Sequence, residues 1–475
     1  MTPSSMRVIF IAVVLPLAQR SHSPIVERQE LDTPWRTNAH AGALAFDTAG
    51  TLAAPTGVSL SVRSNSDLAP MTVAKSLAAD TMGLRIVRLS GHLRTRDVTR
   101  FASIWVEVGS KSGVLIRDRG RNRTSTGTTE WKKFDVDVSI PRSATRIEFG
   151  VVISGTGTAD VEGLTLSPVR TIDPQAPIGQ KPAKLLDSVI TMARKHSLCR
   201  DTVSWNTLLP EVREIAAGAK EEADVYPAIG FLVTRLGDRH SSFVPPRTAI
   251  NRTPNAKPTV QLFENNVGYV NVAGFLGGNL SEVRTYATTV HGRLNATKPA
   301  ATCGWIVDLR DNTGGNYGPM IAALRPFLGD QTLGYFVNRS SAAVWSAKLV
   351  SEAMGIPRHA RGLDDLQTQP VAVLTGPRTG SSGELMTIAF RGRARTRSFG
   401  LPTAGLSTAN SEFALPGGGT LSLTTATDAD RNSVRYGNTV RPDSLFEVSA
   451  AELSGGVDPV QAAAVTWLRG ESKCQ

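Results

Sequence analysis

Residues 371–390, VAVLTGPRTGSSGELMTIAF, are the stretch that decides the fold. The apolar run from Val371 to Leu374 predicts a buried strand, the Gly/Pro segment after it predicts a turn, and a helix is expected to begin at or just after Ser381. A hydroxyl at the start of a helix faces unpaired backbone N–H groups and the positive end of the helix dipole. Ser381 is therefore either a nucleophile whose attack creates an oxyanion or the N-cap of an ordinary strand–helix unit.

Length and charge limit the possible classes of protein. The 475 residues are enough for two to three domains, and the formal net charge is +11. The excess charge is carried by scattered arginines and not by a compact basic run interleaved with aromatic residues, so no nucleic-acid partner is expected. The densest group of arginines follows the predicted helix and consists of Arg391, Arg393, Arg395 and Arg397. This group indicates either a solvated helix end or a contact with an anionic group.

The N-terminus, MTPSSMRVIFIAVVLPLAQRSHS, carries an apolar run from Val8 to Ala18. The run is too short to span a bilayer and is typical of a secretory signal peptide, which we expect over residues 1–23. A short buried strand is the alternative. The prediction is an exported protein, periplasmic or secreted, with no stable membrane span.

The three cysteines are Cys199, Cys303 and Cys474. They show no metal-ligand spacing, and no metal or cofactor is expected. Cys303 lies in a predicted buried strand and is expected to be a small core residue, although one disulfide is possible in an exported protein.

Short β-type segments separated by turns fill residues 30–170. Two of them are LRIVRLSGHLRT and ASIWVEVGS, and the pattern predicts an antiparallel β-sandwich of jelly-roll type. In pattern it resembles a galactose-binding-like sandwich, which implies a binding or spacer role. A Pro-rich linker is expected over residues 171–184.

Helical patterns follow over residues 185–246, with helices expected from Leu185 to His196, from Trp205 to Gly218 and from Glu222 to Leu236. The last helix is followed by the loop LGDRHSSF, in which Asp238 and Ser241 flank His240. Strands and helices alternate over residues 258–448, which predicts an α/β domain with a largely parallel sheet and a hairpin around Gly417 to Gly419. A C-terminal helix and tail are expected over residues 449–475.

The order of residues excludes two familiar mechanisms. No histidine follows Ser381, which excludes the Ser–acid–His order of α/β-hydrolases. The only lysine after Ser381 is Lys473, which argues against a Ser–Lys dyad with a downstream lysine. A base must come from upstream, and His240 has the best motif context. The turn at Gly314 and Gly315, after the strand GWIVDL, either aims N–H groups into a cleft or is simply a tight turn.

Seven motifs in order carry a resemblance to a known family: LGDRHSSF, VGYVNVAGF, GWIVDLRDNTGGNYGPM, VAVLTGPRTGSSGE, FGLPTAG, LPGGGTLSLTTA and NTVRPD. Together they resemble the core of the S41 serine peptidases, of the tail-specific and tricorn-core type. The resemblance implies a ClpP/crotonase-like α/β core and an endopeptidase that acts on peptides or unfolded proteins. It implies Ser381 as nucleophile, and an oxyanion hole made by the N–H of Ser382 with that of Gly314 or Gly315.

The chain also departs from this family's pattern. Leu406 stands near the position of the catalytic lysine of the C-terminal processing branch, so the match is to the tricorn-like branch, whose base corresponds to His240. Tyr436 stands where that branch has a glutamate. The residue that orients or supports His240 therefore stays open among Asp238, Glu412, Asp443 and Tyr436. Because of these departures, a second hypothesis stays open: the chain is a peptide- or ligand-binding protein on the same fold that has lost catalysis.

Overall fold

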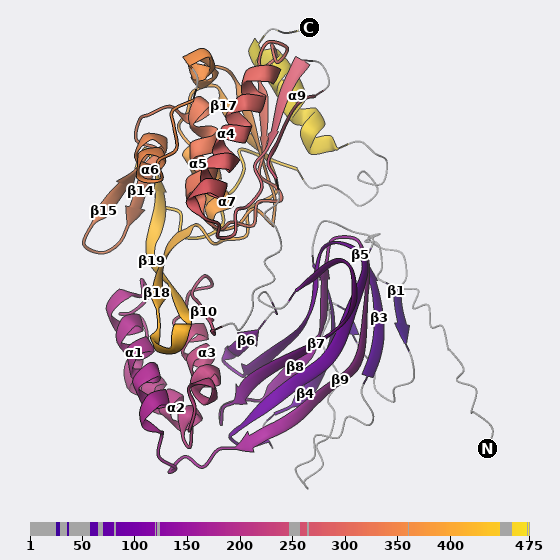
Figure 1. Cartoon of the computed structure of the whole chain (residues 1–475), viewed down its shortest axis with the longest axis vertical. Helices are drawn as coiled ribbons and strands as arrows, with labels where there is room; N and C mark the ends of the chain where they lie inside the picture. Colours follow the sequence, from indigo (N-terminus) through magenta and orange to yellow (C-terminus); the bar gives the residue numbers. More distant parts are fainter. Residues whose placement is uncertain are drawn as a thin grey trace, which may run out of the picture. The chain divides into compact units, whose positions relative to one another are not determined.

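The structure is a computed structural model that describes residues 25–28, 36–37, 58–64, 70–79, 82–118, 120, 124–246, 257–263, 266–359, 361–446, 458–472 and 474 (Figure 1). The signal peptide expected over residues 1–23 lies outside these residues. The chain divides into two compact units. The first unit is Met1–Arg247 with Glu412–Leu423, and the second unit is Thr248–Ser411 with Thr424–Gln475.

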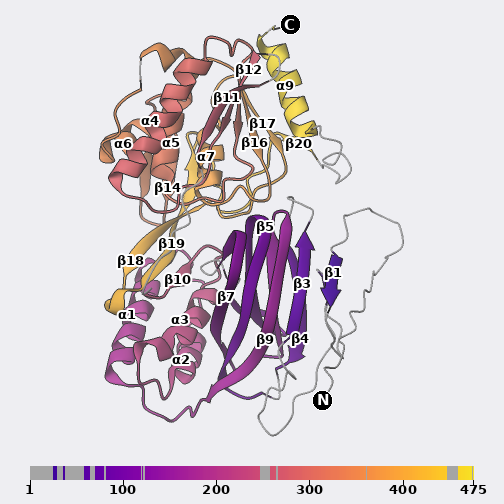
Figure 2. The ribbon, with the colours of Figure 1, turned by 45° about the vertical axis from the view of Figure 1, so that its right-hand side comes forward.

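The first unit contains an antiparallel sheet with the strand order β1-β3-β9-β5-β8-β4-β2, in which β6 and β7 also pair with β5. Figure 2 shows β3, β9, β5 and β7 within this sheet. The β structure expected from the sequence is present. The strands are β1 (Ile25–Arg28), β2 (Arg36–Thr37), β3 (Val58–Ser64), β4 (Met71–Ala78), β5 (Arg85–Ser110), β6 (Gly113–Asp118), β7 (Ser125–Ile140), β8 (Arg146–Ser154) and β9 (Gly157–Thr171).

Strand β5 differs from the sequence prediction of two separate strands. It is a single strand of 26 residues. Its register against β7 shifts repeatedly between Leu93 and Ala102, and Asp97 within this stretch has a φ of 53°. Bulges of this kind bend a strand without ending it. The polar residues between the two apolar segments therefore form a bulged bend where the sequence suggested a break.

The helices of the first unit are α1 (Gln180–His196), α2 (Trp205–Ala216), η1 (Glu222–Val225) and α3 (Tyr226–Thr234). Helix α1 begins at Gln180, within the segment expected to be a linker. Pro182 is compatible with this start, since it lies in the first turn, where no backbone N–H is needed. Apolar faces of the helices share one core with the sheet. The loop with His240 follows α3 and leads into β10 (Ser242–Val244), which pairs with residues 420–422.

The second unit is built on a six-stranded sheet, as the alternation of strands and helices predicted. The strand order is β11-β12-β13-β16-β17-β20, and every neighbouring pair is parallel except β11 with β12. The strands are β11 (Thr259–Phe263), β12 (Val267–Asn271), β13 (Trp305–Asp308), β16 (Val371–Thr375), β17 (Thr396–Gly400) and β20 (Ser444–Leu445).

Helices cover both faces of this sheet. Alternate residues of β16 point to opposite faces, so Val371 and Val373 join one core while Ala372 and Leu374 join the other. The first core contains residues of α4, α5, α6 and α7, and the second contains residues of α9. These helices are α4 (Leu280–Thr297), α5 (Tyr317–Leu328), α6 (Ala347–Ala353), α7 (Ser382–Ala389) and α9 (Pro459–Ser472), with η3 (Arg361–Gln367) between α6 and β16.

A smaller antiparallel sheet includes the hairpin expected near Gly417. Strand β18 (Thr408–Ala414) pairs with β19 (Thr420–Asp430), and the turn between them is η4 (Pro416–Gly418). Residues 427–430 of β19 pair with β14 (Gly334–Val337), which in turn pairs with β15 (Ala342–Trp345).

Cys303 is buried, as expected, but it is not a free thiol. It forms a disulfide with Cys474, which lies just after α9, and the two Cα atoms are 5.5 Å apart. Their sequence separation is 171 residues, so the bond closes a long loop and holds α9 against the sheet. Cys199 is free.

Removing this disulfide should lower the stability of the protein measurably. Long loops gain the most from a cross-link, and we expect Cys474→Ser to reduce the free energy of unfolding by about 2–5 kcal/mol in urea denaturation. Cys199→Ser is the matched control, because Cys199 forms no disulfide. Equal unfolding midpoints for Cys474→Ser and the wild-type protein would contradict the prediction.

Candidate active site

The loop between β16 and α7 carries Ser381 and is tied to the loop that follows β13. The buried Thr379 hydroxyl donates a hydrogen bond to the carbonyl of Leu309 at 2.9 Å and accepts one from the Gly376 N–H at 3.0 Å. The Gly380 N–H donates to the carbonyl of Asn312 at 3.0 Å. These bonds hold the serine loop against the turn that contains Gly314 and Gly315.

Ser381 stands at the start of α7 with an unusual backbone. Its φ is 53° and its ψ is −119°, in a region that residues with a side chain rarely adopt. An ordinary N-cap residue has β-region dihedrals, so capping a helix does not require this conformation. Such strain costs about 1–3 kcal/mol and persists only where neighbouring contacts enforce it, often at functional sites.

The buried carboxylate of Glu384 provides that enforcement. Its Oε2 accepts hydrogen bonds from the Ser381 N–H at 2.9 Å and the Leu406 N–H at 2.7 Å. Its Oε1 accepts from the Gly405 N–H at 2.9 Å and from the Thr403 hydroxyl. Burial raises the pKa of Glu384, and these four hydrogen bonds oppose the rise because they favour the charged form. Glu384 thereby joins the serine loop to residues 403–406.

Three glycines permit the close packing around Ser381. A Cβ atom at Gly314 would lie 2.7 Å from the Ser381 Cβ and 3.2 Å from its Oγ. A Cβ at Gly315 would lie 2.1 Å from the carbonyl oxygen of Phe275, and one at Gly383 would lie 2.3 Å from that of Asn312. Gly314 and Gly315 also have φ values of 103° and 112°, which favour glycine.

The backbone N–H groups beside Ser381 differ in whether they already donate a hydrogen bond. The Gly314 N–H donates to the side-chain oxygen of Asn312 at 3.0 Å. Within the described part of the chain, the N–H groups of Gly315 and Ser382 have no hydrogen-bond partner. The Ser382 hydroxyl donates to the Gly315 carbonyl at 2.5 Å, which links the two residues. Two free donors from adjoining turns are the arrangement that stabilises a developing oxyanion.

Asp428 is a second buried acid near this site. It is 2% exposed, and its Oδ1 has no hydrogen-bond partner among the described residues. Its backbone N–H donates a hydrogen bond to the carbonyl of Ser407, which directly follows residues 403–406, the segment that binds Glu384. Burial, with a smaller contribution from the charge of Glu384, raises the pKa of Asp428 to about 8. Asp428 is therefore largely protonated at neutral pH.

Tyr436 and Asp443, the two residues of the second unit that were candidates for supporting His240, form hydrogen bonds with other residues. The Tyr436 hydroxyl donates to Asp430 at 3.0 Å, and burial raises its pKa. Asp443 accepts hydrogen bonds from the N–H and hydroxyl of Ser398 and from Arg391. Burial opposes ionisation of Asp443, but these hydrogen bonds and the charge of Arg391 hold its pKa below the ordinary value.

His240, Asp238 and Glu412 belong to the first unit. Asp238 accepts hydrogen bonds from the backbone N–H of His240 at 2.9 Å and from the N–H and hydroxyl of Ser241. This pattern shapes the loop through its backbone. His240 is partly exposed, and Glu412 is exposed on β18.

Three residues of this site were not predicted from the sequence. Glu384 lies within the serine motif, and its position three residues after the helix N-cap is a capping-box signal that could have identified it. Asn312 organises the Gly314 turn from a buried position, with its amide donating to the Val272 carbonyl at 3.0 Å. No local pattern marks Asn312 or Asp428, because their roles depend on burial.

Two further properties concern cofactors and membranes. Among the residues that the structure describes, no group of three or more His, Cys, Asp or Glu side chains could hold a metal ion. No helix in that part of the chain is long and apolar enough to cross a membrane.

An α/β domain with a serine on a strained turn beside free amides is typical of a serine hydrolase. Residues 266–445 match the model of peptidase family S41. This match lies in the α/β region, where the ordered sequence motifs predicted a resemblance to the same family.

Individual proteins are also similar to this chain. The nisin-resistance protein of Lactococcus lactis subsp. lactis is 29% identical over 283 residues, which is 58% of this chain and 83% of that protein. An uncharacterized HTH-type transcriptional regulator, YbfP, of Bacillus subtilis strain 168 is 30% identical over 128 residues, 27% of this chain and 43% of that protein. A lipoprotein from Streptococcus agalactiae shares the fold, with a TM-score of 0.50 and 21% identity over 59% of this chain and 96% of that one.

Two glycine-to-alanine changes within helices should have opposite effects on stability. Gly292 is an exposed residue of α4 where an added methyl carbon would meet nothing within 4 Å, so Gly292→Ala should stabilise the protein by about 0.5–1 kcal/mol. The methyl group of Gly383→Ala would press on the Asn312 carbonyl, so this change should destabilise the protein by about 1–3 kcal/mol. Urea denaturation measures both; the same sign for the two would contradict the assigned packing.

Asp428 should make stability depend on pH. Its pKa is raised from 3.8 to about 8, so between these values the folded protein binds more protons than the unfolded chain. The contribution of this group to stability is complete below pH 3.8 and is lost as pH rises to about 8, by at most about 1.4 kcal/mol per unit.

Asp428→Asn should therefore become increasingly more stable than the wild-type protein as the pH rises from about 4 to 8. Urea denaturation at several pH values measures the difference. The exposed acid Glu352 gives the control, Glu352→Gln. A constant difference between Asp428→Asn and the wild-type protein across this range would show that Asp428 does not titrate as described.

Proposed function

We propose that this chain is an exported serine endopeptidase that uses Ser381 as nucleophile and His240 as general base. The match of residues 266–445 to the model of peptidase family S41 supports peptide hydrolysis. The observation that carries the proposal is the strained backbone of Ser381, held by the Glu384 carboxylate at the start of α7. A capping serine alone gives no reason for this strain, whereas a nucleophile benefits from fixed exposure of its hydroxyl.

The oxyanion hole in this proposal consists of the N–H groups of Ser382 and Gly315. Gly314 was an equal candidate from the sequence, but its N–H is already donated to Asn312. Gly314 instead provides the space in which Ser381 lies, because any side chain there would press on the Ser381 Cβ.

His240 is proposed as the base by its motif context, by the tricorn-like resemblance and by the absence of any histidine after Ser381. Asp238 acts as a positioning residue through the backbone of the His240 loop. Asp443 and Tyr436 have other partners and Glu412 is exposed, so the proposal assigns no further acid to the site.

In this mechanism the Ser381 hydroxyl attacks the carbonyl carbon of the scissile peptide bond while His240 takes its proton. The negative charge on the carbonyl oxygen is stabilised by the Ser382 and Gly315 amides. His240 then protonates the leaving amine, and a water molecule, activated by the same histidine, releases the acyl group from Ser381.

The proposed substrates are peptides or unfolded proteins outside the cytoplasm. The Lactococcus relative is a nisin-resistance protein and the Streptococcus structure is a lipoprotein, and both names support export. The Cys303–Cys474 disulfide supports an oxidising compartment. The β-rich first unit is proposed to be a galactose-binding-like jelly-roll sandwich with a binding or spacer role.

The proposal predicts that Ser381→Ala and His240→Gln each lower the rate of cleavage of an unfolded protein substrate by at least about 1,000-fold. A fluorophosphonate probe should label Ser381 in the wild-type protein and should react more slowly with His240→Gln, because the base activates the hydroxyl. Ser411→Ala and His92→Gln, at exposed positions, are the controls and should cleave at the wild-type rate.

Cleavage by Ser381→Ala at the wild-type rate would exclude Ser381 as nucleophile. Absence of both cleavage and labelling in the wild-type protein would favour the alternative of a peptide- or ligand-binding protein that has lost catalysis. Normal activity of His240→Gln would exclude only the assignment of the base.

A further inference from the structure

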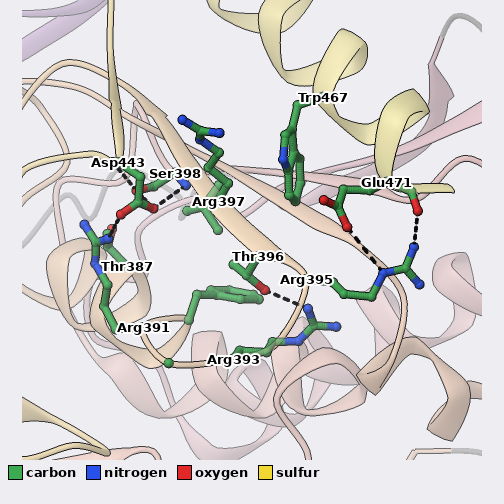
Figure 3. Close-up of a pocket in the computed structure, with 13 residues that line it drawn as sticks. Thr387, Arg391, Arg393, Arg395, Thr396, Arg397, Ser398, Asp443, Trp467 and Glu471 are labelled. Atoms are coloured by element: carbon green, nitrogen blue, oxygen red, sulfur yellow. Dashed lines mark hydrogen bonds and ion pairs between the residues drawn. The ribbon is translucent and has the colours of Figure 1, made fainter.

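A cavity of about 420 Å³ lies in the second unit, at the end of α7, the start of β17 and the last turns of α9 (Figure 3). Ser381 precedes α7 and Phe390 follows it, so the whole helix separates the two sites along the chain. The residues that matter here are Phe390, Arg391, Arg395, Arg397, Trp467 and Glu471.

Positive charge exceeds negative charge around the cavity. Its lining contains four arginines at alternate positions from Arg391 to Arg397, but only two carboxylates, Asp443 and Glu471. Burial is the main reason that the pKa of Arg393 is lowered to about 10, and repulsion from Arg431 and Arg395 adds to this effect. An anion in the cavity would offset this repulsion.

Most of the arginine donors are already committed to the fold. Arg393 donates to the carbonyls of Phe327 at 2.9 Å and of Leu366 at 2.8 Å, so it is a structural residue. Arg391 pairs with Asp443, and Arg395 donates to the Glu471 carbonyl at 2.6 Å. These arginines contribute charge, but few free donors.

Arg397 is the exception. Its side chain is exposed, and its Nε donates to the Ser444 hydroxyl at 2.9 Å. Within the described residues, neither terminal nitrogen of Arg397 has a hydrogen-bond partner or a carboxylate within ion-pair distance. A guanidinium whose two terminal nitrogens are free matches the geometry of a carboxylate or phosphate.

Aromatic rings give the cavity an apolar part. Trp467 is half-buried and Phe390 is buried, and both line the cavity. Figure 3 shows Trp467 between the Arg397 side chain on one side and the Glu471–Arg395 pair on the other. An anion that also carries an apolar or planar group would contact both kinds of surface.

We propose that this cavity binds a small organic anion, whose carboxylate or phosphate is held by Arg397 and whose apolar part lies against Trp467. The site is separate from the proposed catalytic residues and does not depend on catalysis. The competing interpretation is a solvated cluster of arginines that binds nothing.

Isothermal titration calorimetry with three probes tests the proposal at constant ionic strength, set with sodium chloride. Phenyl phosphate and benzoate carry the two possible anionic groups on the same ring, and phenol is the neutral control. We expect at least one of the two anions to bind, and phenol to bind at least 10-fold more weakly. The tighter of the two anions shows which head group the cavity prefers.

Arg397→Gln should weaken binding of that anion by about 10- to 100-fold, because it removes a charged hydrogen bond. Arg397→Lys, which keeps the charge but loses the two-nitrogen geometry, should bind with intermediate affinity. Arg293→Gln removes an exposed arginine of α4 that does not line the cavity and should bind as the wild-type protein does. Failure of both anions to bind, binding of phenol as tight as theirs, or wild-type affinity in Arg397→Gln would overturn the proposal.

Discussion

The arrangement of the loops around Ser381 depends on one buried carboxylate, that of Glu384. It accepts hydrogen bonds from the strained Ser381 loop and from the loop that contains Thr403, Gly405 and Leu406. A charge in a buried site is costly unless its hydrogen bonds are satisfied, so the position of Glu384 requires both loops to stay in place. This mutual requirement holds Ser381 in a conformation that a serine would not adopt by itself.

A second layer of contacts supports the same arrangement. Asn312 supplies its carbonyl to the serine loop and its side-chain oxygen to the Gly314 N–H. Gly314 and Gly383 allow the two loops to touch without a side chain between them. The Gly315 and Ser382 amides are thereby left without partners among the described residues, and this is the arrangement that the proposed oxyanion hole requires.

The elements with a local signal are the ones that the sequence predicts best. The apolar strand Val371 to Leu374, the helix after Ser381 and the helices of the first unit follow from periodicity and were found close to the expected residues. Features that join distant segments carry no such signal. The bulged β5 strand depends on register against its neighbours, and the Cys303–Cys474 bond joins residues 171 positions apart. Neither can be inferred from spacing along the chain.

The sequence by itself determined the alternating α/β core, the resemblance to the S41 peptidases and the candidacy of Ser381, because ordered motifs and hydrophobic periodicity are properties of the chain. Only the tertiary structure decided which amides near Ser381 are free, and that Glu384 and Asp428 are buried together. Hydrogen-bond satisfaction and desolvation depend on atoms brought from distant segments, and these atoms set the backbone of Ser381 and the pKa of Asp428.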